Sequence, residues 1–233
     1  MIVKHLLIAL SVLVLGSGPA LAQPAQHKAA GGNWNAVVNV TPAGTRIVGN
    51  PDAKVRLTEY VSYTCPHCAH FEEVSAAQIN LAFVSGGKGS VEVRHVIRDP
   101  VDMTIALLTN CVPPSRFFVL HTAFMRQQDK WVARLQGIGE GQQKRWNQGD
   151  NAGRMRAIAS DLKFYDFVAS FGLGRAAADR CLADGKLAER IAAQTRDAAA
   201  AGINSTPSFA IDGNVLAGTH DWPTLAPQLA ARM

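Results

Sequence analysis

The stretch YVSYTCPHCAHFEEV, residues 60–74, places two cysteines between two different sequence patterns. Before the cysteines, AKVRLTEYVSY (53–63) is rich in β-branched and aromatic residues, which indicates a strand. After them, apolar residues recur every three or four positions, which predicts a helix. These residues are Phe71, Val74, Ala77, Leu81 and Val84. The cysteine pair therefore lies at a predicted strand-to-helix junction, with Cys65 at the start of the helix.

A thiol at the start of a helix is expected to ionise more easily than a free thiol, because unpaired N–H groups and the helix dipole favour negative charge there. Pro66 suits the first helical position, where its missing N–H costs nothing. His67 adds a hydrogen-bond donor, or a positive charge when protonated. Cys68 lies one turn along the helix, near enough to close a small disulfide. Since a thiolate of low pKa is a good leaving group, CPHC predicts redox chemistry in the oxidising direction.

The first residues of the chain have the layout of a secretory signal peptide. Lys4 gives a positive start, residues 6–15 form an apolar run, and ALA at 20–22 offers a cleavage site. A membrane anchor would need about 20 apolar residues, whereas GSGP at 16–19 ends this run. We expect cleavage after Ala22 and export to the periplasm, a compartment in which disulfides persist.

Other uses of the cysteine pair fit the sequence less well. Covalent haem attachment needs a histidine directly after the second cysteine, whereas Ala69 stands there before His70. A zinc site would need a second pair of ligands, and Cys111 and Cys181 are each alone in the sequence. Two unreactive buried thiols would be unusual in an exported protein. Redox chemistry is therefore the favoured interpretation.

The composition fits a globular protein with a sizeable core. Of the 233 residues, 48% are apolar, and the formal net charge is +5. The positive charge is scattered and no recognition motif accompanies it, so nucleic-acid binding is not expected. After the signal peptide (1–22), residues 23–48 are interpreted as an N-terminal leader. Its first part, residues 23–33, is predicted to be loose, and WNAVVNVTP (34–42) is a candidate peripheral strand.

Two separated motifs resemble the DsbA family of periplasmic thiol–disulfide oxidoreductases, which share a thioredoxin fold. The first is LTEYVSYTCPHCAHFEEV (57–74), and the second is GINSTPSFAIDGNVLAG (202–218). The resemblance extends from about Gly49 onward, and its most specific parts are CPHC and Thr206-Pro207. It implies an α/β protein with a thioredoxin-like fold, in which a helical domain is inserted between the two halves.

The implied halves are residues 49–101 and 202–233, and the helical insertion is residues 102–201. Several segments of the insertion have a helical pattern. A glycine-rich stretch, QGIGEGQQKRWNQGDNAG (136–153), is expected to be a flexible connection. His121 stands among apolar residues and is predicted to be a packed core residue rather than a ligand.

The resemblance also implies roles for residues outside CPHC. The family's late proline is cis and packs against the disulfide, so Pro207 is expected to be cis and Thr206 to offer its backbone to an extended substrate. Glu59 stands six residues before Cys65, where the family has a buried acid that moves protons to and from the resolving cysteine. From the sequence alone, Glu59 could also be a solvated strand residue, although its apolar neighbours on the same face favour burial.

Cys111 and Cys181 lie towards opposite ends of the insertion. In an oxidising compartment, a structural disulfide between them is the simplest account. Two free thiols remain the alternative, because some proteins similar to DsbA have a second cysteine pair and others lack it.

The resulting hypothesis is an exported dithiol oxidase that introduces disulfides into reduced secreted proteins by exchange at Cys65–Cys68. Its redox-active disulfide would serve in place of a cofactor, and no metal is expected. The resemblance implies a quinone-linked membrane reoxidase similar to DsbB. Two alternatives stay open: a disulfide isomerase or reductase of the same fold, and a non-catalytic metal-binding or chaperone-like module. Isomerases of this kind usually oligomerise through an N-terminal domain, for which residues 23–48 are too short, so a monomer is expected.

Overall fold

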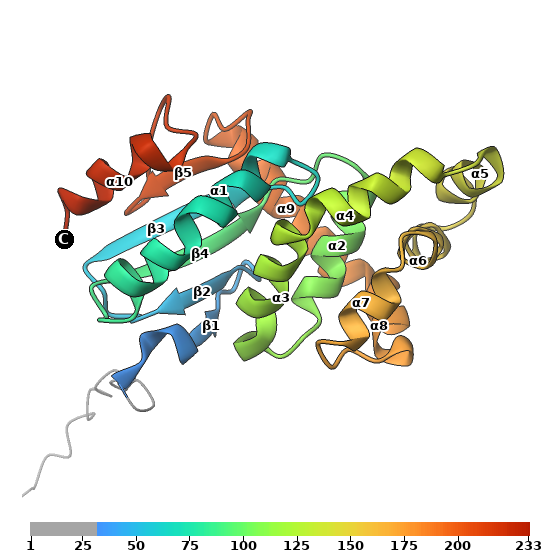
Figure 1. Cartoon of the computed structure of the whole chain (residues 1–233), viewed down its shortest axis with the longest axis horizontal. Coiled ribbons are helices and arrows are strands. Elements are labelled where there is room, and N and C mark those ends of the chain that lie inside the picture. The colour runs from blue at the N-terminus through green and yellow to red at the C-terminus, as the bar shows by residue number, and fades with distance from the viewer. Residues whose placement is uncertain (1–31) are drawn as a thin grey trace, which may run out of the picture.

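The computed structural model describes residues 32–233 (Figure 1). The predicted signal peptide, residues 1–22, and the first part of the predicted leader lie outside the described residues. Within residues 32–233, six strands form one sheet in the order β1-β2-β4-β3-β5-β6. The strands are β1 Val38–Val40, β2 Arg46–Gly49, β3 Val55–Val61, β4 Gly89–His95, β5 Ser208–Ile211 and β6 Asn214–Val215.

The central strand β3 determines where the cysteine pair lies. It runs parallel to β4 on one side and antiparallel to β5 on the other. The C-terminal end of β3 is therefore flanked by the end of β4 and by the beginning of β5. The predicted strand at 53–63 is confirmed as β3.

The second part of the predicted N-terminal leader (23–48) contributes to the sheet. Residues 46–48, at its end, are buried and pair with β4 as part of β2. The peripheral strand expected in residues 34–42 is β1, at the edge of the sheet. The sequence analysis did not anticipate β2, because its backbone pairing with β4 orders residues whose local sequence carries only a weak strand pattern.

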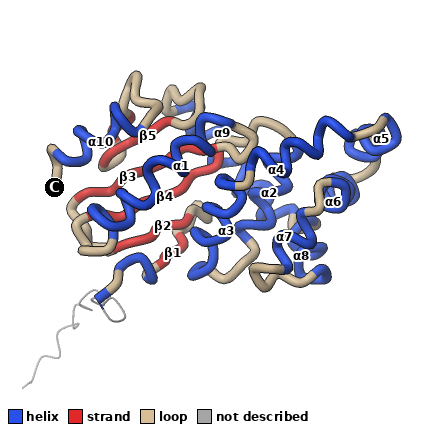
Figure 2. The backbone as a smooth tube through the Cα atoms, viewed as in Figure 1, coloured by secondary structure: helices blue, strands red, loops and turns tan. Residues whose placement is uncertain are grey.

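Helices pack against the sheet, and the segment of the chain between β4 and β5 is helical, from α2 to α9. They are α1 Pro66–Gln78, α2 Pro100–Asn110, α3 Pro114–Arg126, α4 Gln128–Val132, α5 Glu140–Asn147, α6 Asn151–Asp161, α7 Phe164–Ala169, α8 Arg175–Leu182, α9 Gly185–Ala200 and α10 Trp222–Ala230. A π-helical segment η3, Ile79–Val84, follows α1, and a 3-10 helix η4, Ala133–Gly137, follows α4. Figure 2 shows the strands in one half of the molecule and most of α2–α8 in the other. None of the helices in residues 32–233 combines the length and apolar character needed to cross a membrane.

The helix after the cysteine pair is confirmed, but its buried face differs from the one that the apolar period indicated. Val74 and Leu81 are 37% and 75% exposed. Phe71 of the periodic set is buried, and so are Cys68, Glu72 and Ser75, which lie outside that set. Packing against the sheet and α3 selects this face, so that two polar side chains point inward. The period identified a helix correctly but could not identify its inner side.

The glycine-rich stretch 136–153, expected to be a flexible connection, contains helix α5. Contacts with α6 hold it, because Asp161 accepts hydrogen bonds from Arg145 Nη2 (2.9 Å) and from the indole Nε1 of Trp146 (2.8 Å). In addition, Arg154 Nε donates to the carbonyl oxygen of Trp146 at 2.7 Å. The expectation fails because partners in the next helix, rather than local composition, stabilise α5.

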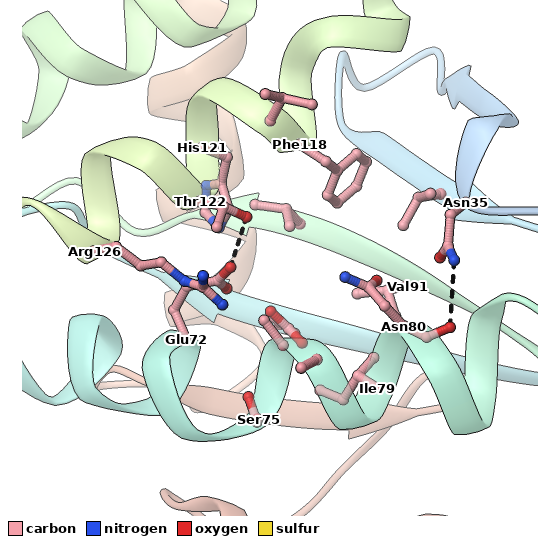
Figure 3. Close-up of a pocket in the computed structure, with 16 residues that line it drawn as sticks. Asn35, Glu72, Ser75, Ile79, Asn80, Val91, Phe118, His121, Thr122 and Arg126 are labelled. Atoms are coloured by element: carbon pink, nitrogen blue, oxygen red, sulfur yellow. Dashed lines mark hydrogen bonds between the residues drawn. The ribbon is translucent and has the colours of Figure 1, made fainter.

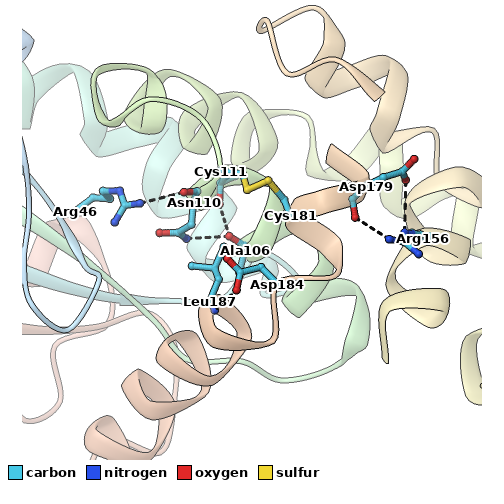
Figure 4. Close-up of a disulfide and its surroundings, with 10 residues drawn as sticks. Arg46, Ala106, Asn110, Cys111, Arg156, Asp179, Cys181, Asp184 and Leu187 are labelled. Carbon is cyan, nitrogen blue, oxygen red and sulfur yellow. Dashed lines mark hydrogen bonds and ion pairs between the residues drawn. A yellow bond between two sulfur atoms is a disulfide. The ribbon is translucent and has the colours of Figure 1, made fainter. Parts of the chain in front are cut away.

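A disulfide joins Cys111, at the C-terminal end of α2, to Cys181 in α8, with their Cα atoms 6.0 Å apart (Figure 4). Arg46 on β2 donates from Nη2 to the carbonyl oxygen of Asn110 at 3.0 Å, which links the sheet to the same end of α2. The disulfide therefore ties two helices of the insertion together at a point where the insertion contacts the sheet.

Replacing Cys111 and Cys181 together with alanine should lower the free energy of unfolding while leaving dithiol oxidation nearly unchanged. The bridge spans a sequence separation of 70 residues, for which the chain-entropy model gives at most about 4 kcal/mol. Chemical denaturation measures the loss. Alkylation of the unreduced wild-type protein after unfolding, followed by intact mass, is the control. If Cys111 and Cys181 were alkylated there, the bridge would be absent in solution.

Candidate active site

Cys65 occupies the N-cap of α1 and Pro66 follows in the first turn, as the junction predicted. Three residues, 62–64, lead from the end of β3 to this cap, and the backbone N–H of Cys65 donates to the carbonyl oxygen of Ser62 at 3.2 Å. Both Cys65 and Cys68 are free thiols in the structure. They are only 3% and 2% exposed. A substrate thiol must therefore come into direct contact with the surrounding residues before it reaches either sulfur atom.

The loop before β5 lies against Cys65. The Thr206–Pro207 peptide bond is cis, and the thiol of Cys65 donates to the carbonyl oxygen of Thr206 at 3.2 Å. The two motifs that are far apart in the sequence meet because β5 pairs with β3, with Ser208 opposite Tyr60. The structure thus brings Cys65, Thr206 and Pro207 into one site.

The environment of Cys65 favours its thiolate. The pKa of Cys65 is lowered from 9.0 to about 5, mainly by the hydrogen bond with the Cys68 thiol. Hydrogen bonds from the side-chain hydroxyl of Thr206 and from the backbone N–H groups of Cys68 and His67 add to the lowering, while burial opposes it. His67 acts here through its backbone, and its side chain is exposed. The backbone N–H groups of His67 and Cys68 belong to the first turn of α1, where backbone donors have no partner within the helix.

Cys68 has the opposite tendency. Its pKa is raised well above the usual value, first by burial and then by its interaction with Cys65. The reduced pair therefore consists of a Cys65 thiolate and a protonated Cys68 thiol at neutral pH. A thiolate is the nucleophile and also the better leaving group in disulfide exchange, so the two cysteines are suited to different steps.

Glu59 lies on the face of β3 that α1 covers, and it is 5% exposed. It lines a cavity of about 500 Å³ between the sheet, α1 and α3 (Figure 3). Glu72 projects from α1 into this cavity and accepts a hydrogen bond from Thr122 Oγ1 at 2.6 Å. Burial, and to a smaller extent the charge of Glu72, raises the pKa of Glu59 to about 8. Glu59 is thus a buried acid that gains and loses its proton near neutral pH.

Substituting Glu59 by glutamine should slow the release of substrate from the mixed disulfide and flatten its pH dependence near pH 8. The physical reason is that Cys68 must lose a proton to attack that disulfide, and an ionised Glu59 can accept it. Single-turnover kinetics across pH 6 to 9 measure the effect. The exposed Glu73→Gln on the same helix is the control. A profile unchanged in Glu59→Gln would remove Glu59 from proton transfer.

A buried polar network fixes the backbone just before Cys65. Asp102 on α2 accepts hydrogen bonds from Ser62 Oγ (2.6 Å) and from the backbone N–H of Tyr63 (2.8 Å). The Tyr63 hydroxyl contacts His121 Nδ1 at 2.9 Å. His121 is 2% exposed, which confirms it as a packed core residue.

Sequence reasoning missed three side chains that shape this site. Gln128, the first residue of α4, donates from Nε2 to the carbonyl oxygens of Tyr63 (2.6 Å) and Cys65 (2.9 Å). Asp99, the N-cap of α2, accepts a hydrogen bond from Thr64 Oγ1 at 2.6 Å. His220 Nδ1 lies 2.8 Å from the carbonyl oxygen of Pro207. No local motif marks Gln128 or His220, whereas Asp99-Pro100 before a helix is a recognisable N-cap sequence.

Comparisons with known proteins agree with this geometry. The chain matches the family model described as Thioredoxin over residues 41–231. It is 56% identical to the crystal structure of a protein-disulfide isomerase from Novosphingobium aromaticivorans, with a TM-score of 0.77, over 81% of this chain and 97% of that one. The α-DsbA1 structure from Wolbachia pipientis is 19% identical, with a TM-score of 0.65, over 82% of this chain and 92% of that one, and shares the fold.

A curated relative from Rickettsia bellii carries a provisional name as a protein-disulfide oxidoreductase. It is 25% identical over 169 residues, which are 72% of this chain and 56% of the relative. The chain thus spans about half the length of that relative. The match to the fold of the Wolbachia protein confirms the expected α/β architecture of thioredoxin type with an inserted helical region.

Proposed function

The chain belongs to the thioredoxin family, and on that premise we propose that it is a thiol–disulfide oxidoreductase that oxidises pairs of cysteines in exported proteins. The observation that carries the proposal is the Cys65 sulfur at the start of α1, whose pKa is lowered to about 5. A thiolate stabilised in the reduced form makes the disulfide form a good electron acceptor.

The exchange takes place in two steps. A substrate thiolate attacks the Cys65 sulfur of the Cys65–Cys68 disulfide, the new mixed disulfide forms, and Cys68 leaves as a thiolate and takes up a proton. A second substrate thiolate then attacks the substrate sulfur, and Cys65 leaves as a thiolate. The substrate loses two electrons and forms its disulfide, and the cysteine pair gains them. Glu59 holds or supplies the proton that Cys68 exchanges.

Thr206 supports the binding of an extended substrate. It precedes β5 and lies beside Cys65, near the C-terminal end of β3. An extended chain that pairs with the backbone of Thr206 would place its own cysteine close to Cys65. We propose reduced secreted proteins as substrates in the periplasm, and a quinone-linked membrane protein that reoxidises Cys65–Cys68.

A second candidate function is disulfide isomerisation. The observation in its favour is the 56% identity to a structure described as a protein-disulfide isomerase. An isomerase must hold a misfolded substrate while Cys65 attacks a wrong disulfide, whereas an oxidase only needs to transfer its own disulfide once.

The two candidates differ in measurable ways. For an oxidase, we expect a monomer by light scattering, rapid oxidation of a reduced two-cysteine protein by the disulfide form, and slow recovery of activity from a scrambled substrate. A Cys65→Ser, Cys68→Ser double variant is the control for background oxidation. A dimer or trimer that rescues scrambled substrate efficiently would favour isomerisation instead.

A further inference from the structure

A hollow of about 390 Å³ lies next to the active-site loop. Apolar side chains from four helical segments line it, namely Val101 of α2, Val132 of α4, Leu135 of η4 and Trp146 of α5, and the polar Gln143 and Asn147 of α5 complete the wall on that side. Thr64, the residue directly before Cys65, forms one end of the hollow. This volume is within the range typical of pockets that bind small organic groups.

The sheet places this hollow on the side of Cys65 away from Thr206. Since β3 lies between β4 and β5, the segment after β4 and the loop before β5 flank the end of β3 on opposite sides. Asp99 and Pro100 follow β4 and line the hollow. An extended chain that pairs with Thr206 and passes Cys65 towards the β4 side would reach the hollow.

Hydrogen bonds hold the walls of the hollow in place relative to Cys65. The Gln128 amide at the start of α4 donates to the Cys65 carbonyl oxygen, and Thr64 Oγ1 donates to Asp99. At the far wall, the Trp146 indole is fixed by its hydrogen bond to Asp161. The hollow and the reactive sulfur are thus parts of one structure.

We propose that this hollow binds an apolar side chain of the substrate polypeptide, one to three residues from the cysteine that is joined to Cys65. The proposal rests on the proposed function and adds a substrate preference to it. An extended chain advances about 3.3 Å per residue, so the hollow beside Thr64 is within reach of near neighbours of the reacting cysteine. Unfolded polypeptides expose aliphatic and aromatic side chains, whose burial against Val101, Leu135 and Trp146 is favourable.

Rates with designed peptides test the preference. Reduced two-cysteine peptides would carry phenylalanine or serine at one, two or three residues before or after the first cysteine. At one or more of these positions, phenylalanine should raise the second-order rate constant of oxidation by roughly tenfold, in line with burial of one apolar side chain. Trp146→Ala should reduce this preference to near one, because the phenylalanine side chain loses the wall against which it packs.

Two further variants separate loss of the pocket from loss of structure. Val132→Phe adds volume to the wall on α4 without changing any residue of α5 and should also abolish the preference. Trp34→Ala, which removes a half-buried tryptophan of the segment before β1, should keep it. Equal rates for phenylalanine and serine peptides in the wild type, or a preference that persists in both Trp146→Ala and Val132→Phe, would overturn the proposal.

Cross-linking locates the side chain directly. A peptide with a photoreactive benzoylphenylalanine at the preferred position would be trapped as a mixed disulfide on Cys68→Ser, irradiated and digested. Cross-links within residues 132–147 support the proposal, and cross-links confined to β6 or α10 overturn it. A twofold molar mass by light scattering that halves in Trp146→Ala would assign the hollow to a second copy of the chain and also overturn it. If no peptide formed a mixed disulfide at all, the proposed function itself would fail.

Discussion

Cys65→Ser should abolish dithiol oxidation completely, whereas Cys68→Ser should accumulate a stable mixed disulfide with the substrate. Only Cys65 occupies the N-cap of α1 and has its pKa lowered to about 5. Cys68 is more deeply placed on the helix, and its pKa is raised. A substrate thiolate should therefore attack the Cys65 sulfur. Cys68 can reverse this step by attacking the mixed disulfide and releasing the substrate thiol, so the mixed disulfide should persist when Cys68 is replaced.

Non-reducing gels and intact mass of each variant, after mixing with a peptide activated as a mixed disulfide, measure the trapping. Cys68→Ser should gain the mass of one peptide on Cys65, and Cys65→Ser should gain none at position 68. The matched control is the Cys111→Ala, Cys181→Ala protein, which should keep its activity. The reverse trapping pattern would show that the roles of Cys65 and Cys68 are exchanged.

Local sequence patterns are sufficient to predict the strand and the helix on either side of the cysteine pair. The β-branched run before Cys65 and the helical period after it depend on neighbours within a few turns, so β3 and α1 could be predicted from them. The meeting of Thr206 with Cys65 is a contact between distant residues. It was expected only because two motifs in the right order resemble a known family.

Features that depend on distant contacts could not be predicted in this way. The inner face of α1 carries Glu72 instead of Val74 because α3 supplies the hydrogen bond from Thr122. Helix α5 exists in a glycine-rich stretch because Asp161 binds Arg145 and Trp146. Gln128 reaches the carbonyl oxygen of Cys65 across 63 residues of chain. In each case the residue that determines the structure is distant in the sequence, and a local hydrophobic period carries no information about such a contact.

The reduced protein should be more stable than the oxidised protein at neutral pH, and the difference should shrink on acidification. The folded pKa of Cys65, about 5, lies below its ordinary value of 9.0. A group with a lowered folded pKa contributes its full stability above the unfolded pKa and loses it as the pH falls through the folded pKa. At pH 7, which lies between the folded and unfolded values, about two of the four units contribute, which is at most roughly 3 kcal/mol and less once solvent screening is counted. The disulfide form has no such contribution because its sulfur atoms do not titrate.

The same linkage predicts a maximum in the difference. The pKa of Cys68 is raised by folding, so its ionisation favours the unfolded reduced chain once the pH exceeds the unfolded pKa. The stability difference should therefore rise from about pH 5 to about pH 9 and decline above it. Glu59 and Asp102 also have raised pKa values, but they are present in both redox forms, so to first approximation their effects cancel in the comparison.

Denaturant unfolding of both redox forms at pH 4.5, 7 and 9 measures the two free energies. The Cys111–Cys181 bridge must stay intact in the reduced sample, which intact mass after alkylation verifies. Cys65→Ala, which cannot form the disulfide, is the control for the reduced form alone. Without the Cys65 thiolate, its free energy of unfolding should lose the part of the rise between pH 5 and 9 that the wild-type reduced protein shows. If the oxidised form were the more stable one at pH 7, Cys65–Cys68 would favour the disulfide state. It would then act as a reducing or structural pair, and the oxidase proposal would have to be abandoned.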